Sequence, residues 1–241
     1  MKKGILKSLM FVGAVLAMVG CVEEYTPPEK EALPMSELTQ DLKDSITFMY
    51  NEEGLAYDVY LNVYNTLLDE QNITVKQLKM IAENAEIQHM AAVDALAIKY
   101  DLNMTTYDPT IEPYSKEGIG NGVYSIPHIQ DLYNKLYAKG TTGANKNALN
   151  KNALEMGCIV EVVDIIDLQG YIVQAEEANA TDVLKEFDFL ITGSYTHYWA
   201  FDKALRTLNG DVNNSELGCC SIDDSVFGSD FCHPEYPNVK M

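Results

Sequence analysis

The sequence predicts an all-α fold in which four long amphipathic helices form a bundle. Three observations support this prediction. Four segments repeat apolar residues every three or four positions, no segment of useful length alternates as a strand does, and turn or capping residues separate the helical segments. Residues 36–241 are long enough to bury one good core, with the bundle expected over 36–208 and a cysteine-containing tail over 209–241.

The first two helices are expected to form an antiparallel hairpin. The first runs from Ser36 to about Glu70, and a short turn at Gln71 leads directly into the second. Thr74 followed three residues later by Gln77 is a capping-box pattern, so the second helix is expected to begin at Thr74 and to fade near residue 101.

A long connection follows this hairpin. Residues 102–125 contain Pro, Gly and Tyr without a helical period, and they predict a crossover between the second and third helices. A short extra helix is expected over 126–138, with Pro127 in its first turn. The third helix is expected over 148–178 and the fourth over 181–208, again joined by a short turn.

The first 21 residues are similar to a bacterial lipoprotein signal peptide. A basic start precedes a charge-free apolar run over 9–20, which is too short for an ordinary spanning helix. The run ends in a lipobox-like sequence, so Cys21 is expected to become the lipidated first residue; an anchor that stays uncut is the alternative. Residues 22–35 are acidic and contain several prolines, which predicts a flexible tether. We expect a cell-envelope location outside the cytoplasm, at the outer membrane or cell surface.

The chain is strongly acidic. Without the three lysines of the signal peptide, 14 basic residues stand against 36 acidic ones, so the net charge is near −22. Phosphate backbones are repelled by such a surface, which excludes nucleic acid as a partner. The expected partners are the membrane through the lipid, a metal ion or small oxidant as ligand, and a second copy of the chain in a homodimer.

The remaining cysteines fall into two groups. Cys158 lies on a helical core stripe, where it is expected to act as a small hydrophobic residue. In the tail, Cys232 is expected to form a disulfide with Cys219 or Cys220, because disulfides persist outside the cytoplasm. A metal site built from these three cysteines and His233 is the alternative, although its spacing fits no common zinc pattern.

Each of the four helical stripes contains a carboxylate or an imidazole. Residues three or four apart share a helix face, so these polar groups are expected to point toward the bundle axis. A buried charge is costly unless it is paired or bound to a metal. The sequence therefore predicts a metal site in the bundle core, and a hydrogen-bonded network without metal is the alternative. The candidate ligands are Glu53, Glu86, His89, Glu161, Asp164 and His197.

Two of these motifs resemble those of the ferritin-like superfamily, and of rubrerythrins in particular. Residues 53–60 resemble the Glu-x-x-Ala-x-x-x-Tyr of their first helix, and residues 86–89 resemble the Glu-x-x-His of their second. Together with residues 159–168 and 193–197, they are similar to one ferritin-like domain family of unknown function. The resemblance covers about residues 38–208 and implies a ferritin-like four-helix bundle.

The resemblance also implies a role for each candidate ligand. Glu86 would bridge two metals, while Glu53 and His89 would be terminal ligands. The other matches are the helix-three carboxylate Glu161, the additional helix-three acid Asp164 and the helix-four histidine His197. Ser194 departs from the pattern, because di-iron members have a second bridging glutamate there. The site is therefore expected to hold one metal, or two that are bound unevenly.

These ligands predict iron as the cofactor, as one or two ions. Carboxylates with one or two imidazoles also suit manganese or zinc. We expect a membrane-tethered protein that oxidises Fe(II) or reduces peroxide, as di-iron oxidases and peroxidases do. The alternatives are a structural or interaction lipoprotein with a metal-free polar core, and a hydrolase that uses a single zinc at the same residues.

Overall fold

The computed structural model describes residues 35–102, 122–124 and 126–238. The predicted signal peptide, Cys21 and most of the tether therefore lie outside the described residues, as does most of the crossover. Within the described part the fold is all-α, as predicted, and the only β pairing is an isolated bridge in the tail. The helices are α1 (Gln40–Gln71), α2 (Lys76–Ile81), α3 (Ile87–Lys99), α4 (Pro127–Thr141), α5 (Lys146–Glu177) and α6 (Thr181–Leu208).

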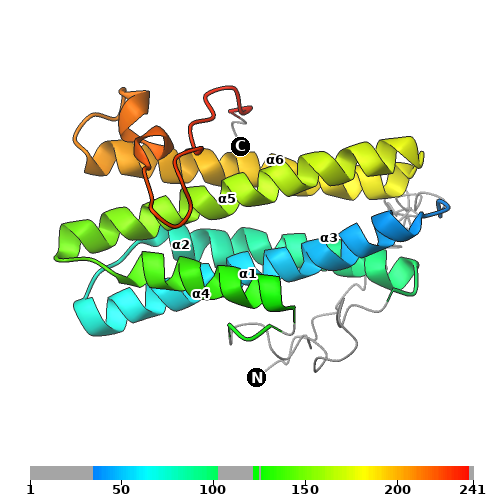
Figure 1. Ribbon diagram of the computed structural model, residues 1–241, viewed down its shortest axis with the longest axis horizontal. Coiled ribbons are helices and arrows are strands. Elements are labelled where there is room, and N and C mark those ends of the chain that lie inside the picture. Colours follow the sequence, from blue (N-terminus) through cyan, green and yellow to red (C-terminus); the bar gives the residue numbers. More distant parts are fainter. Residues whose placement is uncertain (1–34, 103–121, 125, 239–241) are drawn as a thin grey trace, which may run out of the picture. The chain divides into compact units, whose positions relative to one another are not determined.

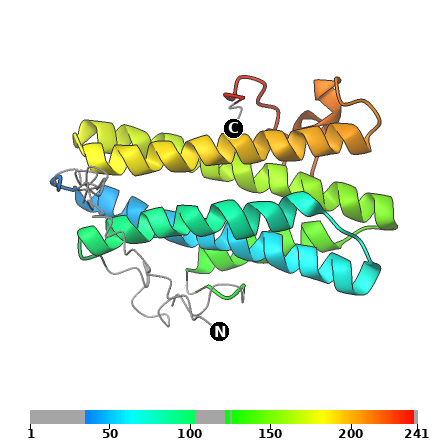
Figure 2. The ribbon, with the colours of Figure 1, turned by 180° about the vertical axis from the view of Figure 1, so that it is seen from behind.

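Two antiparallel pairs make up the bundle. Figures 1 and 2 show α5 beside α6, and α1 beside the line formed by α2 and α3. The extra helix α4 packs against α1 and α5. The inner faces bury a continuous apolar core, and its largest fully buried side chains include Tyr60, Tyr198, Phe187 and Phe201. Burial of these faces, rather than helix propensity, is the main source of stability for such helices.

The second helix of the bundle is interrupted by a π turn. Residues Ala82–Glu86 form this turn between α2 and α3. Single π turns inside α-helices occur often at functional sites. Here the turn changes the helical phase, so that Glu86 and His89 are buried while Ile87 is exposed. Ala85, which shares the apolar spacing of this helix, lies at the edge of the buried face.

The helix ends agree with the prediction to within a few residues, apart from one cap. The side chain of Thr39 accepts a hydrogen bond from the Leu42 amide and begins α1, four residues after the expected start. The predicted capping box at Thr74 is wrong, because Val75 is the N-cap of α2 and no side chain caps that end. At α5, Asn145 accepts from the Ala148 amide.

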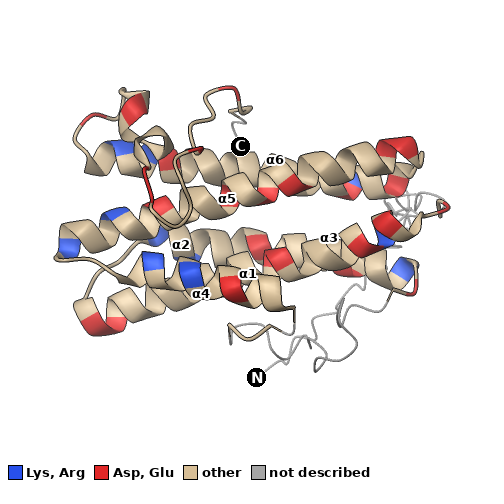
Figure 3. Cartoon of the chain, viewed as in Figure 1, with Lys and Arg blue, Asp and Glu red and all other residues tan. Residues whose placement is uncertain are grey.

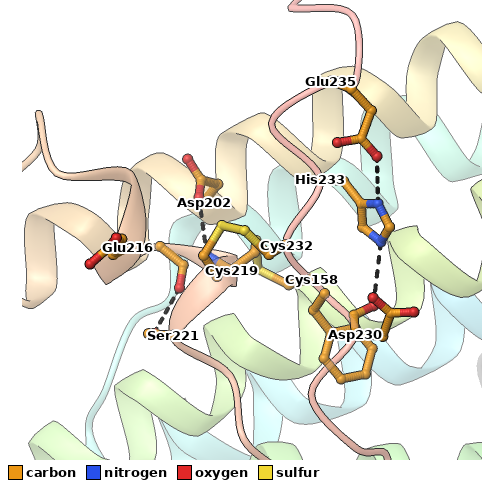
Figure 4. Close-up of a disulfide and its surroundings, with 12 residues drawn as sticks. Cys158, Asp202, Glu216, Cys219, Ser221, Asp230, Cys232, His233 and Glu235 are labelled. Atoms are coloured by element: carbon orange, nitrogen blue, oxygen red, sulfur yellow. Dashed lines mark hydrogen bonds and ion pairs between the residues drawn. A yellow bond between two sulfur atoms is a disulfide. The ribbon is translucent and has the colours of Figure 1, made fainter.

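The tail is held against the bundle by two disulfides. One joins Cys158 of α5 to Cys219, and the other joins Cys220 to Cys232. Figure 4 shows both bonds close together, with Asp202 accepting a hydrogen bond from the Cys219 amide at 3.0 Å. The expectation that Cys158 acts only as a small hydrophobic residue is wrong, because it forms a disulfide. The apolar position that suggested a small hydrophobic residue is equally suited to a buried disulfide.

Aromatic contacts continue this attachment along α6. The Tyr198 hydroxyl donates to the Phe231 carbonyl at 3.0 Å, and the Trp199 indole lies 3.2 Å from the Tyr236 carbonyl. The tail is thus part of the folded unit.

Among the described residues, none of the helices is both long enough and apolar enough to cross a membrane.

Candidate metal centre

The centre lies in the bundle core, where the long helices each contribute a side chain. Five residues meet there, and each is at least 95% buried. Burial places their charges in a medium where electrostatic interactions are strong. They are Glu53 from α1, Glu86 from the π turn, His89 from α3, Glu161 from α5 and His197 from α6.

These residues form two groups that share Glu86. In the first group, Nδ1 of His89 lies 3.1 Å from Oε2 of Glu53 and 3.2 Å from Oε2 of Glu86. In the second, Nδ1 of His197 lies 3.2 Å from Oε1 of Glu86 and 3.4 Å from Oε2 of Glu161. In each group, one ligand atom from each residue lies within 4.8 Å of the others. Glu86 therefore contributes one oxygen to each group.

The donor set fits divalent cations. Three buried carboxylates converge, and within the described residues their ion pairs are with histidine rather than with Lys or Arg. In Figure 3, Lys and Arg lie toward the ends of the helices, whereas Asp and Glu extend across the middle. Oε1 of Glu53 is buried without a hydrogen-bond partner among the described residues, and the 3.2 Å ion pair between Oε1 of Glu86 and Nδ1 of His197 lacks the geometry of a hydrogen bond. Oxygen and imidazole donors of this kind suit iron, manganese and zinc.

The electrostatics follow from burial and from the five neighbouring charges. Burial lowers the pKa of both imidazoles, but the adjacent carboxylates raise it by more than burial lowers it. Glu53 and Glu86 raise the pKa of His89 well above its usual range, and Glu161 with Glu86 raises the pKa of His197 to about 10. Burial raises the pKa of Glu53 well above normal, whereas for Glu86 the two imidazoles outweigh burial and lower the pKa. A metal must displace these imidazole protons, so its binding releases protons.

Comparison with known proteins places the chain in a family. A family model described as "Uncharacterized protein domain (DUF2202)" matches residues 42–225. The chain belongs to this DUF2202 family. It is also 32% identical over 183 residues to "Uncharacterized protein MJ0754" of Methanocaldococcus jannaschii, an alignment that covers 76% of this chain and 83% of that protein. No solved structure matches the chain.

The DUF2202 match contains all six candidate ligands predicted from the sequence, and the structure brings five of them together. The sixth, Asp164, stands outside both groups. Its Oδ2 accepts a hydrogen bond from Ser194 at 2.6 Å. Burial and the nearby Glu161 raise the pKa of Asp164 to about 7. The serine that departs from the ferritin-like pattern thus holds an acid beside the centre.

Two further residues shape the DUF2202 centre without belonging to the predicted ligand set. The Tyr60 hydroxyl donates to Oε1 of Glu161 and so fixes that carboxylate. Burial and Glu161 raise the pKa of Tyr60 well above its usual value, which keeps it a donor. Gly193 lies against the His89 ring and leaves no room for a side chain. The spacing of Glu53 and Tyr60 by two helical turns was a signal for the tyrosine, whereas no local pattern marks the glycine.

The other two histidines of this DUF2202 chain lie elsewhere. His128 is exposed near the start of α4 and is absent from both groups. His233 stacks on Tyr236 in the tail and pairs with Glu235. The alternative metal site of cysteines and His233 is wrong, because all the cysteines that it requires are in disulfides.

Proposed function

We propose that this DUF2202 protein is a ferritin-like metal protein that binds two iron ions in the core of its bundle. The observation that carries the proposal is the pair of Glu/His groups joined at Glu86. Each group has its own carboxylate, its own imidazole and one oxygen of the shared glutamate. Glu86 and His89 on the second long helix, with acids on α1 and α5, support the ferritin-like assignment. Manganese or zinc would fit the same donors.

The proposed reaction is the oxidation of bound Fe(II) by a small oxidant such as peroxide. Bound iron would supply one electron per ion, so two ions and two protons would reduce one hydrogen peroxide molecule to two water molecules. The chain holds the ions with carboxylate and imidazole groups and positions Glu161 through Tyr60. Its apolar core limits the access of water to these groups.

We further propose that the protein is anchored by lipid at Cys21 in the cell envelope, outside the cytoplasm. The lipobox-like sequence before Cys21 supports this location. The two disulfides also support it, because disulfides persist in oxidising compartments and are rare in the cytosol.

Metal content tests the proposed function. Purified protein is loaded anaerobically with Fe(II), desalted, and assayed for metal per chain by mass spectrometry. We expect two equivalents in the wild type and less than one in Glu86→Gln, because Glu86 serves both groups. Glu155→Gln is a matched control, since Glu155 is a buried α5 glutamate that pairs with Lys139 and lies outside the centre. This variant should keep two equivalents.

The main rival is a structural protein whose His–Glu pairs stabilise the bundle without metal. The four ion pairs of the centre favour it. It predicts a folded wild type with no stoichiometric metal and an unchanged melting temperature in chelator. It also predicts that Glu86→Gln costs about 3–5 kcal/mol by leaving buried partners unpaired. One equivalent of iron would contradict the two-ion proposal and indicate a mononuclear site.

A further inference from the structure

A small cavity lies beside the centre, between α1, α4 and α5. Its volume is about 20 Å³. Most of its wall is aliphatic, including Ala56 of α1, Leu132 of α4 and Val163 of α5. Glu52 and Asp164 supply its two polar side chains. Leu132 and Val163 are partly exposed, so this part of the cavity wall lies close to the surface.

One wall of this cavity carries an unsatisfied hydrogen-bonding atom. Glu52 is 7% exposed, and its carboxyl group is hydrogen-bonded to Asp167, but its Oε2 has no hydrogen-bond partner among the described residues. A buried carboxyl oxygen without a partner is costly, so such an atom indicates a ligand or water that satisfies it. Asp164 connects the cavity to the centre, since it lines the cavity and accepts a hydrogen bond from Ser194, three residues before His197.

We propose that this cavity is the docking site for hydrogen peroxide on its way to the metal centre. The inference rests on the proposed function, because only a metal centre gives peroxide a reaction there. A site for one water needs about 10–15 Å³, so this cavity admits a molecule of one or two heavy atoms. Hydrogen peroxide has two donors and two acceptors, and it can pair with a carboxyl group whether that group is ionised or protonated.

Two other small ligands fit the cavity less well. Dioxygen has no hydrogen to donate, so it leaves Oε2 of Glu52 unsatisfied. A metal ion needs several oxygen or nitrogen ligands, and the aliphatic wall around Ala56 and Val163 offers none. The same wall excludes bulky hydroperoxides, so the cavity selects its oxidant by size.

The reaction that follows docking is balanced by the iron of the proposed function. The O–O bond of peroxide breaks, two Fe(II) ions each give one electron, and two protons from solvent complete two water molecules. The products are two Fe(III) ions and two waters. The docking site takes no part in the electron transfer and only brings the oxidant to the centre.

Variants that fill or widen the cavity test the proposal. Ala56→Leu fills it, Val163→Leu is a milder second filling variant, and Leu132→Ala widens its mouth. Ile166→Phe is the control, because Ile166 is exposed on α5 and lies outside the cavity. Each variant is loaded with Fe(II), its iron content is measured, and bound Fe(II) is mixed with hydrogen peroxide or tert-butyl hydroperoxide while Fe(III) absorbance is followed.

We expect the filling variants to keep wild-type iron content but to lose at least about tenfold in the rate with hydrogen peroxide. The wild type should react at least about tenfold more slowly with tert-butyl hydroperoxide than with hydrogen peroxide. In Leu132→Ala the difference between these two rates should be smaller. The control should behave as the wild type. If a folded, iron-loaded filling variant reacts with hydrogen peroxide at the wild-type rate, the docking site is wrong.

A second measurement uses metal-free protein and does not depend on iron chemistry. Hydrogen peroxide is titrated into protein with labelled methyl groups, and NMR shifts of Ala56 and Val163 are followed. We expect both methyls to shift, and the Val163 shift to be absent in Ala56→Leu. Methyls that do not move would show that the cavity holds water only. If the wild type binds no iron, the proposed function fails, while this titration still decides whether peroxide occupies the cavity.

Discussion

Gly193 of α6 lies directly against the imidazole of His89 on α3. A Cβ atom at position 193 would fall 2.3 Å from Nε2 of His89, well inside van der Waals contact. The glycine therefore lets α6 approach α3 closely enough for His89 and His197 to face the same glutamate, Glu86. Because Nε2 of His89 faces Gly193, Nδ1 is the nitrogen that is directed at the carboxylates.

Gly193→Ala should therefore disrupt the first Glu/His group, and with it the proposed binding of metal there. The new methyl group displaces the His89 ring, and we expect iron content to fall from two equivalents to one or less. Metal per chain by mass spectrometry checks this. Gly170→Ala is the matched control, because no atom lies within 4 Å of a Cβ there. It should keep its iron and gain up to about 1 kcal/mol of stability from higher helix propensity.

Tyr60→Phe tests the hydrogen bond that orients Glu161. Removing the hydroxyl leaves a buried carboxyl oxygen without its donor, which should cost about 1–3 kcal/mol. Urea unfolding in chelator measures this cost for Tyr60→Phe, for Glu161→Gln and for the double variant. We expect the double variant to be less destabilised than the sum of the two single variants. Strict additivity would show that the two side chains act independently.

The two disulfides should differ in their contribution to stability. The Cys158–Cys219 bond closes a loop with a sequence separation of 61, whereas the Cys220–Cys232 bond closes one of 12. From the loss of chain entropy in the unfolded state, we expect the first bond to stabilise the fold by about 4 kcal/mol and the second by about 3 kcal/mol. Paired Cys→Ala variants at each bond, compared by denaturant unfolding, test this order. A larger loss for the Cys220 and Cys232 pair would contradict it.

The pH dependence of folding should reflect Asp182 at the start of α6. Burial disfavours its charge, but hydrogen bonds from Lys99, Tyr100 and Ser36 lower the pKa of Asp182 to about 2. A pKa below the ordinary value of 3.8 means that its stabilising effect is complete above about pH 4 and is lost as pH falls toward 2. Asp182→Asn should therefore flatten the decrease in unfolding free energy over this range. If the unfolding free energy of Asp182→Asn falls between pH 4 and 2 as steeply as that of the wild type, Asp182 is not the source of this pH dependence.

The sequence was informative about the helices because their patterns are local. Apolar periodicity and short turns predict the four long helical segments. The positions of Glu53 and Glu161 within the apolar stripes predict that both carboxylates face the core, where the structure buries them. Both features depend on residues within a few turns of each other, which a single sequence records.

The features that could not be predicted depend on contacts between distant segments. The Cys158–Cys219 bond joins residues that are 61 positions apart. In the sequence, Cys158 has the spacing of an ordinary core residue of α5. The need for Gly193 arises only when α6 meets His89. The orphaned oxygen of Glu52 becomes visible only once α4 closes the cavity.

The π turn at Ala82–Glu86 absorbs one additional residue in the helix that carries Glu86 and His89. A π turn accommodates one residue more than an α-helical turn, and each α-helical residue advances the chain by about 100°. Deleting a single codon within the turn would preserve the reading frame and nearly all the composition. It would also convert the bulge into a regular α-helical turn and leave α3 in register, so that His89 would still face Glu53. Deleting one residue between Glu86 and His89, beyond the turn, would instead place these two side chains on different faces of the helix. The turn is therefore the part of this helix where the loss of one residue disturbs the centre least.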